Sequence, residues 1–433
     1  MDLAYRAAMS RFLLAFNGTR GDIQPAVVIG AELGRRGHDV VVGAPPNLCG
    51  FVAAAGLSAE PFGYDTQAHM NSDVVRTRMR TGGPRQRWQA FTEIRDLGWS
   101  QAISDMSALG AGADAILTGF VTEQIAAPFA ESVGAACISV HHAPIRPNSA
   151  VSPVPAAVSG LPPALNRASW WLTDTAMWLL TRDRQNALRR ELGVDGTVAR
   201  SPRDRLEIQA YDPLLCPELV AEWSDDRPFV GFLGLSGEQR RRIAADTADA
   251  ELLDWVRTGT EPVYFGFGSM PVPDPAAVVG AIVTACDRLG VRALISTGWA
   301  DLAPSDAENV RVVGALDHEQ ILPLCRVAVH HGGAGTTAAA MRAGIPSLVC
   351  WVGSDQPFWG ARCVRHGVGA STRLKGLTAE TLVAELTTVL APDCARRAEE
   401  IAGELITPEQ AVLRCADLIE ERTDANLRSR ARR

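Results

Sequence analysis

The chain contains almost no lysine, although it is rich in arginine. Among its 433 residues the only lysine is Lys375, in the segment RLKG. A P-loop nucleotide site needs a lysine inside its glycine loop, and a pyridoxal enzyme needs one for its Schiff base. Lys375 lies in neither context, so the sequence argues against both classes.

Three further features argue against nucleic-acid binding, a membrane span, and disulfide or zinc sites. The formal net charge is −7, which argues against nucleic acid as a partner because phosphate backbones are held by basic surfaces. No apolar run approaches the ~20 residues needed to span a bilayer. The nine cysteines are never spaced as C-x-x-C. We therefore expect no disulfide framework and no zinc site, but small core residues in a reducing compartment.

The first residues, MDLAYRAAMSRFLLAF, do not read as a signal peptide. Their apolar run is short, and a glycine-rich turn follows it instead of a small-residue cleavage site. We expect a cytoplasmic chain, with Met9 as an alternative start to Met1.

Short β-branched segments alternate with helical ones in two separate stretches of the chain. This alternation is typical of parallel sheets covered by helices on both faces. It predicts two Rossmann-like halves. In the first half we expect strands at 11–16, 38–46, 113–120 and 136–142, with helices at 23–37 and 122–134. In the second half we expect strands at 262–270, 292–297, 310–315, 327–331 and 346–352, with helices at 275–290, 318–325, 338–343 and 353–367.

The segment between the halves is rich in proline and charge, as a linker would be. We expect an N-terminal domain over 1–215, a linker over 216–245, a C-terminal domain over 246–405 and a last helix with a basic tail over 406–433. The final residues, RSRARR, are expected to be disordered.

The segment HHGGAGTT, residues 330–337, follows an apolar strand and precedes a helix. Glycines there let a phosphate approach the free N–H groups at a helix N-terminus, and threonine hydroxyls add donors. Either histidine can donate a further hydrogen bond. The segment thus predicts a diphosphate cradle, although a tight turn beside a core histidine remains the simpler alternative. The cradle residues are His330, His331, Gly332, Gly333, Gly335 and Thr336.

Three other polar turns follow strands in the two halves. Ser269 lies in GFGSM and Thr19 in GTRGD, while GSDQP carries Asp355 and Gln356. A carboxylate and an amide can grip two adjacent sugar hydroxyls, although a helix cap is the alternative for Asp355. Asp22, the acid of GTRGD, could act as a general base on a hydroxyl, and again a helix N-cap is the alternative. A base in that position favours direct displacement with inversion.

The motifs GTRGDIQP, GFGS, HHGGAGTT and GSDQ, at these relative positions, resemble those of the two-domain GT-B nucleotide-sugar glycosyltransferases. More narrowly, they resemble family 1, in the bacterial branch that glycosylates vancomycin-type peptides, sterols and mycobacterial glycolipids. The resemblance covers about 10–415 and implies a GT-B fold whose sheets face each other across a cleft. It also implies that the helix at 407–421 packs back across the domains.

The resemblance also implies residue roles. Asp22 would be the catalytic base, Asp355 and Gln356 would hold the donor sugar, and no metal or cofactor beyond the nucleotide sugar would be needed. Thr19, Ser269, His330, Gly333, Gly335 and Thr336 would surround the donor diphosphate. The acceptor side would include His141, His142, Arg146 and Asn148.

Two departures from the family bear on catalysis and on the donor. Plant relatives have a histidine where Asp22 stands, paired with a separate aspartate, so here the carboxylate itself would have to serve. Their tryptophan under the uracil and glutamate on the ribose correspond to Ala315 and Ala338. The loss of the ribose carboxylate fits a deoxyribose donor such as a TDP-sugar better than a UDP-sugar. Trp299 is a candidate neighbour of the base, or a half-buried packing residue.

Two segments rich in tryptophan and leucine, 87–103 and 166–182, are suited to an apolar acceptor. Helix core or an interdomain face is the alternative for both. An apolar acceptor would also suit a peripheral encounter with the inner face of a membrane, although no basic amphipathic helix demands one.

We therefore expect an inverting, metal-independent transferase that moves a hexose or 6-deoxyhexose from a TDP- or UDP-sugar to a hydroxyl. The acceptor would be a lipid, lipopeptide, sterol or similar natural product. A nucleotide-sugar epimerase of the same fold and a non-catalytic nucleotide-sugar sensor remain as rivals. Donor and acceptor together discriminate them, because the epimerase needs donor alone and the sensor converts neither.

Overall fold

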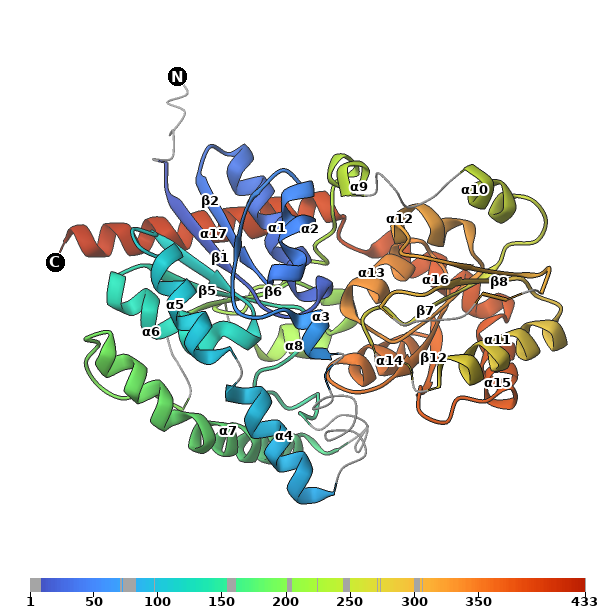
Figure 1. Cartoon of the computed structure of the whole chain (residues 1–433), viewed down its shortest axis with the longest axis horizontal. Helices are drawn as coiled ribbons and strands as arrows, with labels where there is room; N and C mark the ends of the chain where they lie inside the picture. Colours follow the sequence, from blue (N-terminus) through green and yellow to red (C-terminus); the bar gives the residue numbers. More distant parts are fainter. Residues whose placement is uncertain are drawn as a thin grey trace.

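The computed structural model of the protein describes residues 9–70, 72, 83–96, 98–153, 161–200, 205–223, 225–243, 250–270, 272, 274–299, 304–305 and 307–432. Figure 1 shows two halves side by side, each a sheet between helices. The last helix, α17 (Pro408–Ala431), runs back from the second half along the first. The expected α/β fold of two Rossmann-like domains is confirmed.

The first sheet has six parallel strands in the order β3-β2-β1-β4-β5-β6. β1 lies at its centre, where Leu13 pairs with Val41 of β2 and Ile116 of β4. After its first residue β1 is entirely buried, as expected of a strand covered on both faces. The strands are β1 (Arg11–Ala15), β2 (Asp39–Ala44), β3 (Ser58–Pro61), β4 (Ala115–Thr118), β5 (Ala136–His141) and β6 (Leu206–Gln209).

The second sheet repeats this arrangement in the order β12-β11-β10-β7-β8-β9. In its centre His330, the last residue of β10, pairs with Gly266 of β7 and Val349 of β11. The motif segments therefore leave neighbouring parallel strands at one edge of the sheet. The strands are β7 (Val263–Gly266), β8 (Ala293–Ser296), β9 (Val310–Val313), β10 (Val327–His330), β11 (Ser347–Trp351) and β12 (Gly369–Arg373).

Helices cover the faces of both sheets (Figure 1). In the N-terminal half they are α1 (Arg20–Arg35), α2 (Cys49–Ala54), α3 (Thr66–Met70), α4 (Pro84–Asp96), α5 (Trp99–Leu109), α6 (Glu123–Val133), α7 (Pro163–Glu191), α8 (Pro217–Glu222) and α9 (Gly237–Ile243). The C-terminal half has α10 (Ala250–Arg257), α11 (Pro275–Leu289), α12 (His318–Ile321), α13 (Ala334–Arg342), α14 (Gln356–Arg365), α15 (Ala379–Val389) and α16 (Pro392–Glu404).

The two faces of the first sheet bury different helices, because successive strand residues point to opposite faces. Leu14 belongs to a core that includes Val27 of α1 and Ile419 of α17. Its neighbour Leu13 belongs to a core with Met106 of α5 and Phe129 of α6. The C-terminal helix is thus part of the N-terminal core.

A buried aromatic cluster joins the two halves. Tyr211, Phe229 and Phe232, which follow β6, pack with Met341 of α13 and Trp359 of α14. Part of the segment expected as a linker is therefore an interdomain core. Residues 224 and 244–249, at the expected linker and domain boundary, lie outside the described residues.

Three expected helix starts are wrong, and one of them is α14, which begins at Gln356 rather than at 353. The other two are those of α1 and α13. α1 begins at Arg20, three residues before the expected position 23. α13 begins at Ala334 rather than at 338, because the backbone already turns helical directly after Gly333. In both places the helix begins within the motif, so its free N–H groups lie beside the motif side chains.

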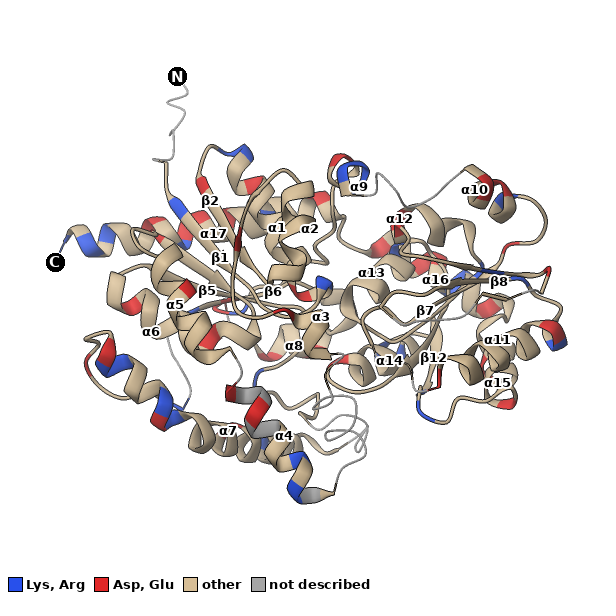
Figure 2. Ribbon diagram, viewed as in Figure 1, with Lys and Arg blue, Asp and Glu red and all other residues tan. Residues whose placement is uncertain are grey.

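The expected disorder of the last residues is also wrong, since α17 continues through Ala431. Asn426 Nδ2 donates to the Gly134 carbonyl at the end of α6, at 2.9 Å. The Arg430 guanidinium lies against the same glycine. Figure 2 shows basic residues gathered at this free end of α17, where cations suit the helix dipole.

Candidate active site

The turn after β10 requires glycine at one position. Gly332 has a φ of +88°, and a Cβ there would meet Val349 Cγ1 at 2.6 Å. A Cβ at Gly333 would meet the ring of His331, also at 2.6 Å. These two glycines let the chain turn directly from the strand into the N-terminus of α13.

The two adjacent histidines have different surroundings. His330 is fully buried, and its Nδ1 accepts a hydrogen bond from the Gly332 backbone N–H at 3.1 Å. His331 instead lines a cavity at the N-terminus of α13. Burial lowers the pKa of His331 to about 4, against the opposing charge of Asp355. The ring at the cavity is therefore neutral and can donate through one N–H.

This cavity, which we call the donor cavity, has a volume of about 630 Å³ and is lined by both halves of the molecule. Of the predicted donor residues, the structure brings all but His330 and Gly332 to its wall. Thr19, Arg20 and Asp22 come from the N-terminal half. The predicted residues from the C-terminal half are Ser269, Trp299, Ala315, His331, Gly333, Gly335, Thr336, Asp355 and Gln356.

Asp355 and Gln356 lie at the start of α14 and are held by local bonds. Asp355 stands at the N-cap position without a side-chain cap bond. Its Oδ2 accepts from Trp359 Nε1 at 3.0 Å. The Gln356 side-chain oxygen accepts from the Val352 N–H at 2.7 Å, which fixes the turn after β11. The other oxygen, Asp355 Oδ1, takes no part in this bond, and Asp355 lies at the cavity wall.

Asp22 occupies the third position of α1, not the N-cap that was its alternative reading. Thr19 is the N-cap, and Asp22 Oδ2 accepts from its backbone N–H at 2.7 Å and its hydroxyl at 3.1 Å. This capping box fixes the carboxylate. Gly18, with a φ of +138°, permits it, because a Cβ there would collide with Asp22.

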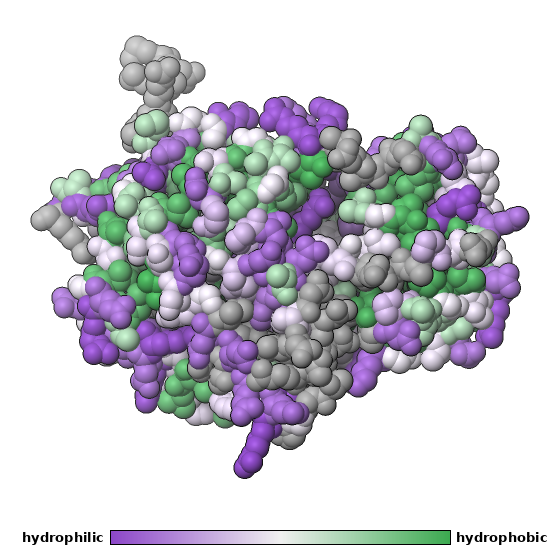
Figure 3. All heavy atoms as spheres, viewed as in Figure 1, coloured by the Kyte–Doolittle hydropathy of each residue, from purple (hydrophilic) through white to green (hydrophobic). Residues whose placement is uncertain are grey.

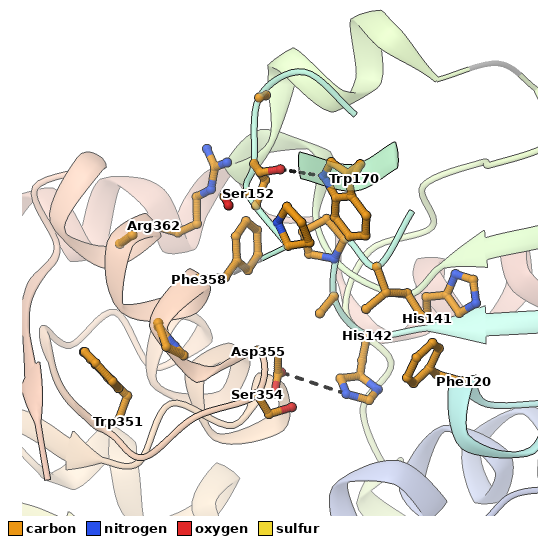
Figure 4. Close-up of a pocket in the computed structure, with 18 of the residues that line it drawn as sticks. Phe120, His141, His142, Ser152, Trp170, Trp351, Ser354, Asp355, Phe358 and Arg362 are labelled. Atoms are coloured by element: carbon orange, nitrogen blue, oxygen red, sulfur yellow. Dashed lines mark hydrogen bonds and ion pairs between the residues drawn. The ribbon is translucent and has the colours of Figure 1, made fainter. Parts of the chain in front are cut away.

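The second Asp22 oxygen faces His142, the residue after β5. His142 Nε2 lies 4.0 Å from Asp22 Oδ1 and 3.9 Å from Asp355 Oδ2. Figure 4 shows the imidazole pointing toward Asp355 across the space between the halves. A histidine from the first half thus stands between carboxylates of the two halves.

A second cavity, of about 830 Å³, adjoins the donor cavity; we call it the acceptor cavity. Asp22, His142, Ser354 and Asp355 line both. Figure 4 shows its aromatic wall. The apolar lining includes Phe120, Val121, Val140, Ile145, Val151, Trp170, Trp351, Pro357 and Phe358.

Comparison with known proteins identifies the family of this fold and site. Residues 12–130 match the model of the glycosyltransferase family 28 N-terminal domain, and residues 295–416 that of the erythromycin biosynthesis protein CIII-like C-terminal domain. An uncharacterized glycosyltransferase of Mycobacterium leprae is 41% identical over 98% of this chain and 99% of its own. The chain belongs to the family 1 GT-B glycosyltransferases.

Another relative agrees with this glycosyltransferase assignment, and solved structures agree with the fold. A sterol 3-beta-glucosyltransferase of Arabidopsis thaliana is 31% identical over 86% of this chain and 59% of its own. The glycosyltransferase of kitacinnamycin has a TM-score of 0.69 at 18% identity, covering 96% of this chain and 99% of its own. A spinosyn rhamnosyltransferase complexed with thymidine diphosphate has a TM-score of 0.62 at 19% identity, covering 94% of this chain and 100% of its own. At such identities these structures show the fold.

Two of the predicted acceptor-side residues of the glycosyltransferase belong to a buried ionic cluster. Nε2 of His141 lies 2.6 Å from Glu123 Oε1. Arg146 donates to Glu123 at 2.7 Å and to Glu207 at 2.8 Å. Burial opposes ionisation of Glu123, but His141 and Arg146 outweigh it and hold the Glu123 pKa below its ordinary value. The cluster ties α6, β5 and β6 to the loop after β5.

The third of these residues, Asn148, shapes that loop. Its side-chain oxygen accepts from the backbone N–H groups of Ala150 and Val151, at 2.9 and 2.6 Å. Val151 in turn accepts from Trp170 Nε1 at 2.7 Å. The wall of the acceptor cavity is therefore fixed by hydrogen bonds through Asn148. Whether His141, Arg146 and Asn148 contact the acceptor stays a prediction.

Sequence reasoning missed Glu123, Glu207 and Arg20. Glu207 could have been found from the sequence, because it places a charged residue inside a strand whose residues are all buried. A buried charge needs a partner. Arg20 lines the donor cavity next to Thr19, and burial lowers its pKa against the charge of Asp317. Arg20 could have been found from its position in the GTRGD turn, between the predicted site residues Thr19 and Asp22.

Neither a metal-binding cluster nor a membrane-spanning helix is found among the described residues. No group of three or more His, Cys, Asp or Glu side chains comes together there in a way that could hold a metal. None of the helices in the described part of the chain is both long and apolar enough to cross a bilayer.

Proposed function

We propose that this glycosyltransferase moves a hexose or 6-deoxyhexose from a TDP-sugar to a hydroxyl of an apolar acceptor, with inversion at the anomeric carbon. The acceptor class is a lipid, lipopeptide, sterol or similar natural product. One observation carries the proposal: the donor and acceptor cavities meet at Asp22, His142 and Asp355.

Asp22 is the proposed general base. Its Oδ2 is held by the capping box of α1, which leaves Oδ1 to accept the proton of the acceptor hydroxyl. The acceptor oxygen then forms the new bond to the anomeric carbon as the bond from that carbon to the diphosphate oxygen breaks. The electron pair leaves with the nucleoside diphosphate. One displacement inverts the configuration.

The N-terminus of α13 is the proposed site of the leaving diphosphate. Gly333, Gly335 and Thr336 line the donor cavity there, so free N–H groups and the positive end of the helix dipole face the phosphates. The neutral His331 ring adds one N–H donor. We propose that these groups stabilise the charge of the diphosphate without a metal ion and that no cofactor besides the nucleotide sugar is used.

TDP is the proposed donor nucleotide because the donor side lacks a carboxylate for the ribose hydroxyls of UDP. Ala338 is 2% exposed, so no carboxylate reaches a ribose hydroxyl from that position. The solved spinosyn rhamnosyltransferase with thymidine diphosphate supports the same choice.

The aromatic wall of the acceptor cavity supports an apolar acceptor, because such cavities bind by apolar contact with few polar anchors. The similarity to a sterol glucosyltransferase agrees with it. We propose that His142 contacts the acceptor hydroxyl beside Asp22. His141, Arg146 and Asn148 would act by positioning the loop after β5.

The test is a transfer assay with TDP-, UDP- and GDP-sugars against a panel of sterols, lipids and phenols. We expect product with TDP-sugars in the presence of acceptor, and a loss of about 10²–10⁴ in kcat/KM for Asp22→Asn. Asp183→Asn, at an exposed position on α7, is the matched control. Donor conversion without acceptor would favour the epimerase, and donor binding without any turnover would favour the sensor; either result contradicts the proposal.

A further inference from the structure

Three arginines line the donor cavity, and carboxylates of the same wall neutralise two of them. Arg240 of α9 lies 3.2 Å from Asp317, and Arg342 of α13 pairs with Glu319. Figure 3 shows the surface hollowed between the two halves beside α9, the helix that brings Arg240 to this cavity. The third arginine, Arg20, forms no ion pair with a carboxylate in the part of the chain that the structure describes. Its charge is therefore left for a ligand of the cavity.

The position of Arg20 is unfavourable for the helix that carries it. Arg20 is the first residue of α1, where the positive end of the helix dipole repels a cation. Its guanidinium lies 4.8 Å from the centre of the Phe51 ring, and this contact limits its orientation. Burial lowers the pKa of Arg20 although the charge of Asp317 opposes the shift. The stability of α1 does not explain an arginine here, whereas an anion bound in the cavity would.

The proposed diphosphate cradle at the N-terminus of α13 has no fully charged group of its own. It offers backbone N–H groups, the Thr336 hydroxyl and the ring of His331, whose pKa of about 4 leaves it neutral at pH 7. A diphosphate brings negative charge into a cavity that already contains carboxylates, and it gains more as the bond to the sugar breaks. Among the described residues of the wall, the three arginines face four acids, which are Asp22, Asp317, Glu319 and Asp355. The donor therefore needs a cation that no carboxylate has neutralised.

We propose that Arg20 donates hydrogen bonds from the N-terminal half to the terminal phosphate of the donor, the phosphate bonded to the sugar. This inference rests on the proposed nucleotide-sugar donor. Asp22, the proposed base, lies two residues further along the first turn of α1 and has to act at the anomeric carbon that this phosphate holds. A guanidinium suits the contact because its planar set of N–H donors matches phosphate oxygens. The same contact binds the leaving group and places the base beside the reacting carbon.

The test is isothermal titration of the full chain with TDP, UDP and GDP, and with the monophosphate of whichever nucleoside binds. We expect Arg20→Gln to weaken binding of the diphosphate about 10- to 100-fold and binding of the monophosphate less than about threefold, because only the diphosphate has the terminal phosphate. Arg20→Lys keeps the charge without the planar donors, so its affinity should lie between the two. Arg35→Gln, at the other end of α1 with a side chain 68% exposed, is the matched control and should bind both nucleotides as the unaltered chain does.

Thermal unfolding separates loss of binding from loss of folding. Arg20→Gln should leave the Tm unchanged or raise it, because the repulsion at the N-terminus of α1 is removed. Equal losses of affinity for diphosphate and monophosphate would overturn the proposal, since Arg20 would then shape the cavity instead of binding the terminal phosphate. A diphosphate that Arg20→Gln binds as tightly as the unaltered chain does would overturn this inference alone. If the unaltered chain binds none of the three diphosphates, the proposed donor is wrong and this inference is wrong with it, so the two failures are distinguishable.

Discussion

At the level of single residues, neighbouring side chains of the same type have different tasks. His330 ends β10 with its ring in the core, whereas His331 begins the turn and reaches the donor cavity. The two oxygens of Asp22 also differ in their contacts. Oδ2 accepts a hydrogen bond from the N-terminus of its own helix, whereas Oδ1 faces His142 in the cleft. What each group can do chemically depends on the bonds it has already made.

Replacing His331 tests the assignment of the cradle. We expect His331→Ala to weaken TDP binding about 10- to 100-fold, because one hydrogen bond to a charged oxygen is worth about 1.5–3 kcal/mol. His330→Ala is the matched control; it should lower the free energy of unfolding more than it changes TDP affinity, since its ring is fully buried. Isothermal titration of both variants with TDP gives the answer, and equal losses of affinity would contradict the assignment.

A methyl group at Gly332 tests the geometry of the turn. Gly332→Ala should lower the free energy of unfolding by about 1–3 kcal/mol, because the backbone is left-handed there and the Cβ meets Val349. Gly280→Ala, inside α11 with open space around it, should instead raise stability by about 0.5–1 kcal/mol. Urea unfolding measures both, and two changes of the same sign would count against this geometry.

At the level of elements, ends of strands and helices build the site, and a buried ionic cluster behind it fixes the loop after β5. Glu123 opens α6, and Arg146 lies in that loop. Their side chains are 12% and 16% exposed. Removing one member of such a pair leaves an unpaired charge in the interior.

Arg146→Met should therefore lower the free energy of unfolding by about 3–5 kcal/mol at neutral pH. The pKa of Glu123 is lowered in the folded protein, so its stabilising effect is present above its ordinary pKa of about 4.3 and is lost as the pH falls through the lowered value. The difference between the variant and the unaltered chain should shrink as the pH falls below about 4. Arg396→Met, at an exposed pair with Glu400, is the control and should change little. Urea unfolding across this pH range tests the expectation, which a constant difference would contradict.

The presence of strands and helices was predictable from the sequence, but their exact ends and the contacts between distant side chains were less so. Strands were predictable because they are short apolar runs ended by glycine turns, as at β10 and the turn at Gly332. The start of α1 was misplaced because Asp22 was considered as an N-cap, whereas Thr19 takes that position and Asp22 completes the capping box. Which histidine faces the cavity depends on where β10 ends, and no periodicity reveals this. The pairing of Glu123 with Arg146 joins residues far apart in sequence, so only the fold reveals it.

At the level of the whole molecule, the last helix belongs to the core of the first half. Arg36 donates to Glu420 of α17 at 2.6 Å, and Ala411, Cys415 and Ile419 are fully buried. The interdomain cluster around Trp359 joins the halves from the other side. The cleft that holds both cavities is therefore braced by two separate contacts between distant parts of the chain.

Removing α17 tests this bracing. A chain that ends at residue 405 should lose at least about 3 kcal/mol of stability, since the apolar core of the N-terminal half would be uncovered. A chain that ends at residue 427 is the control, because it keeps the buried residues and the Asn426 hydrogen bond to Gly134. Denaturant unfolding compares the two, and equal stabilities would show that α17 is not part of the core.

The anomeric configuration of the product tests the central claim most directly. With an α-configured TDP-sugar and a phenol acceptor, displacement by a hydroxyl activated at Asp22 should give the β-linked product alone, as read from the coupling of the anomeric proton by NMR. An α-linked product would require a second displacement and would contradict Asp22 as the single base across the cleft.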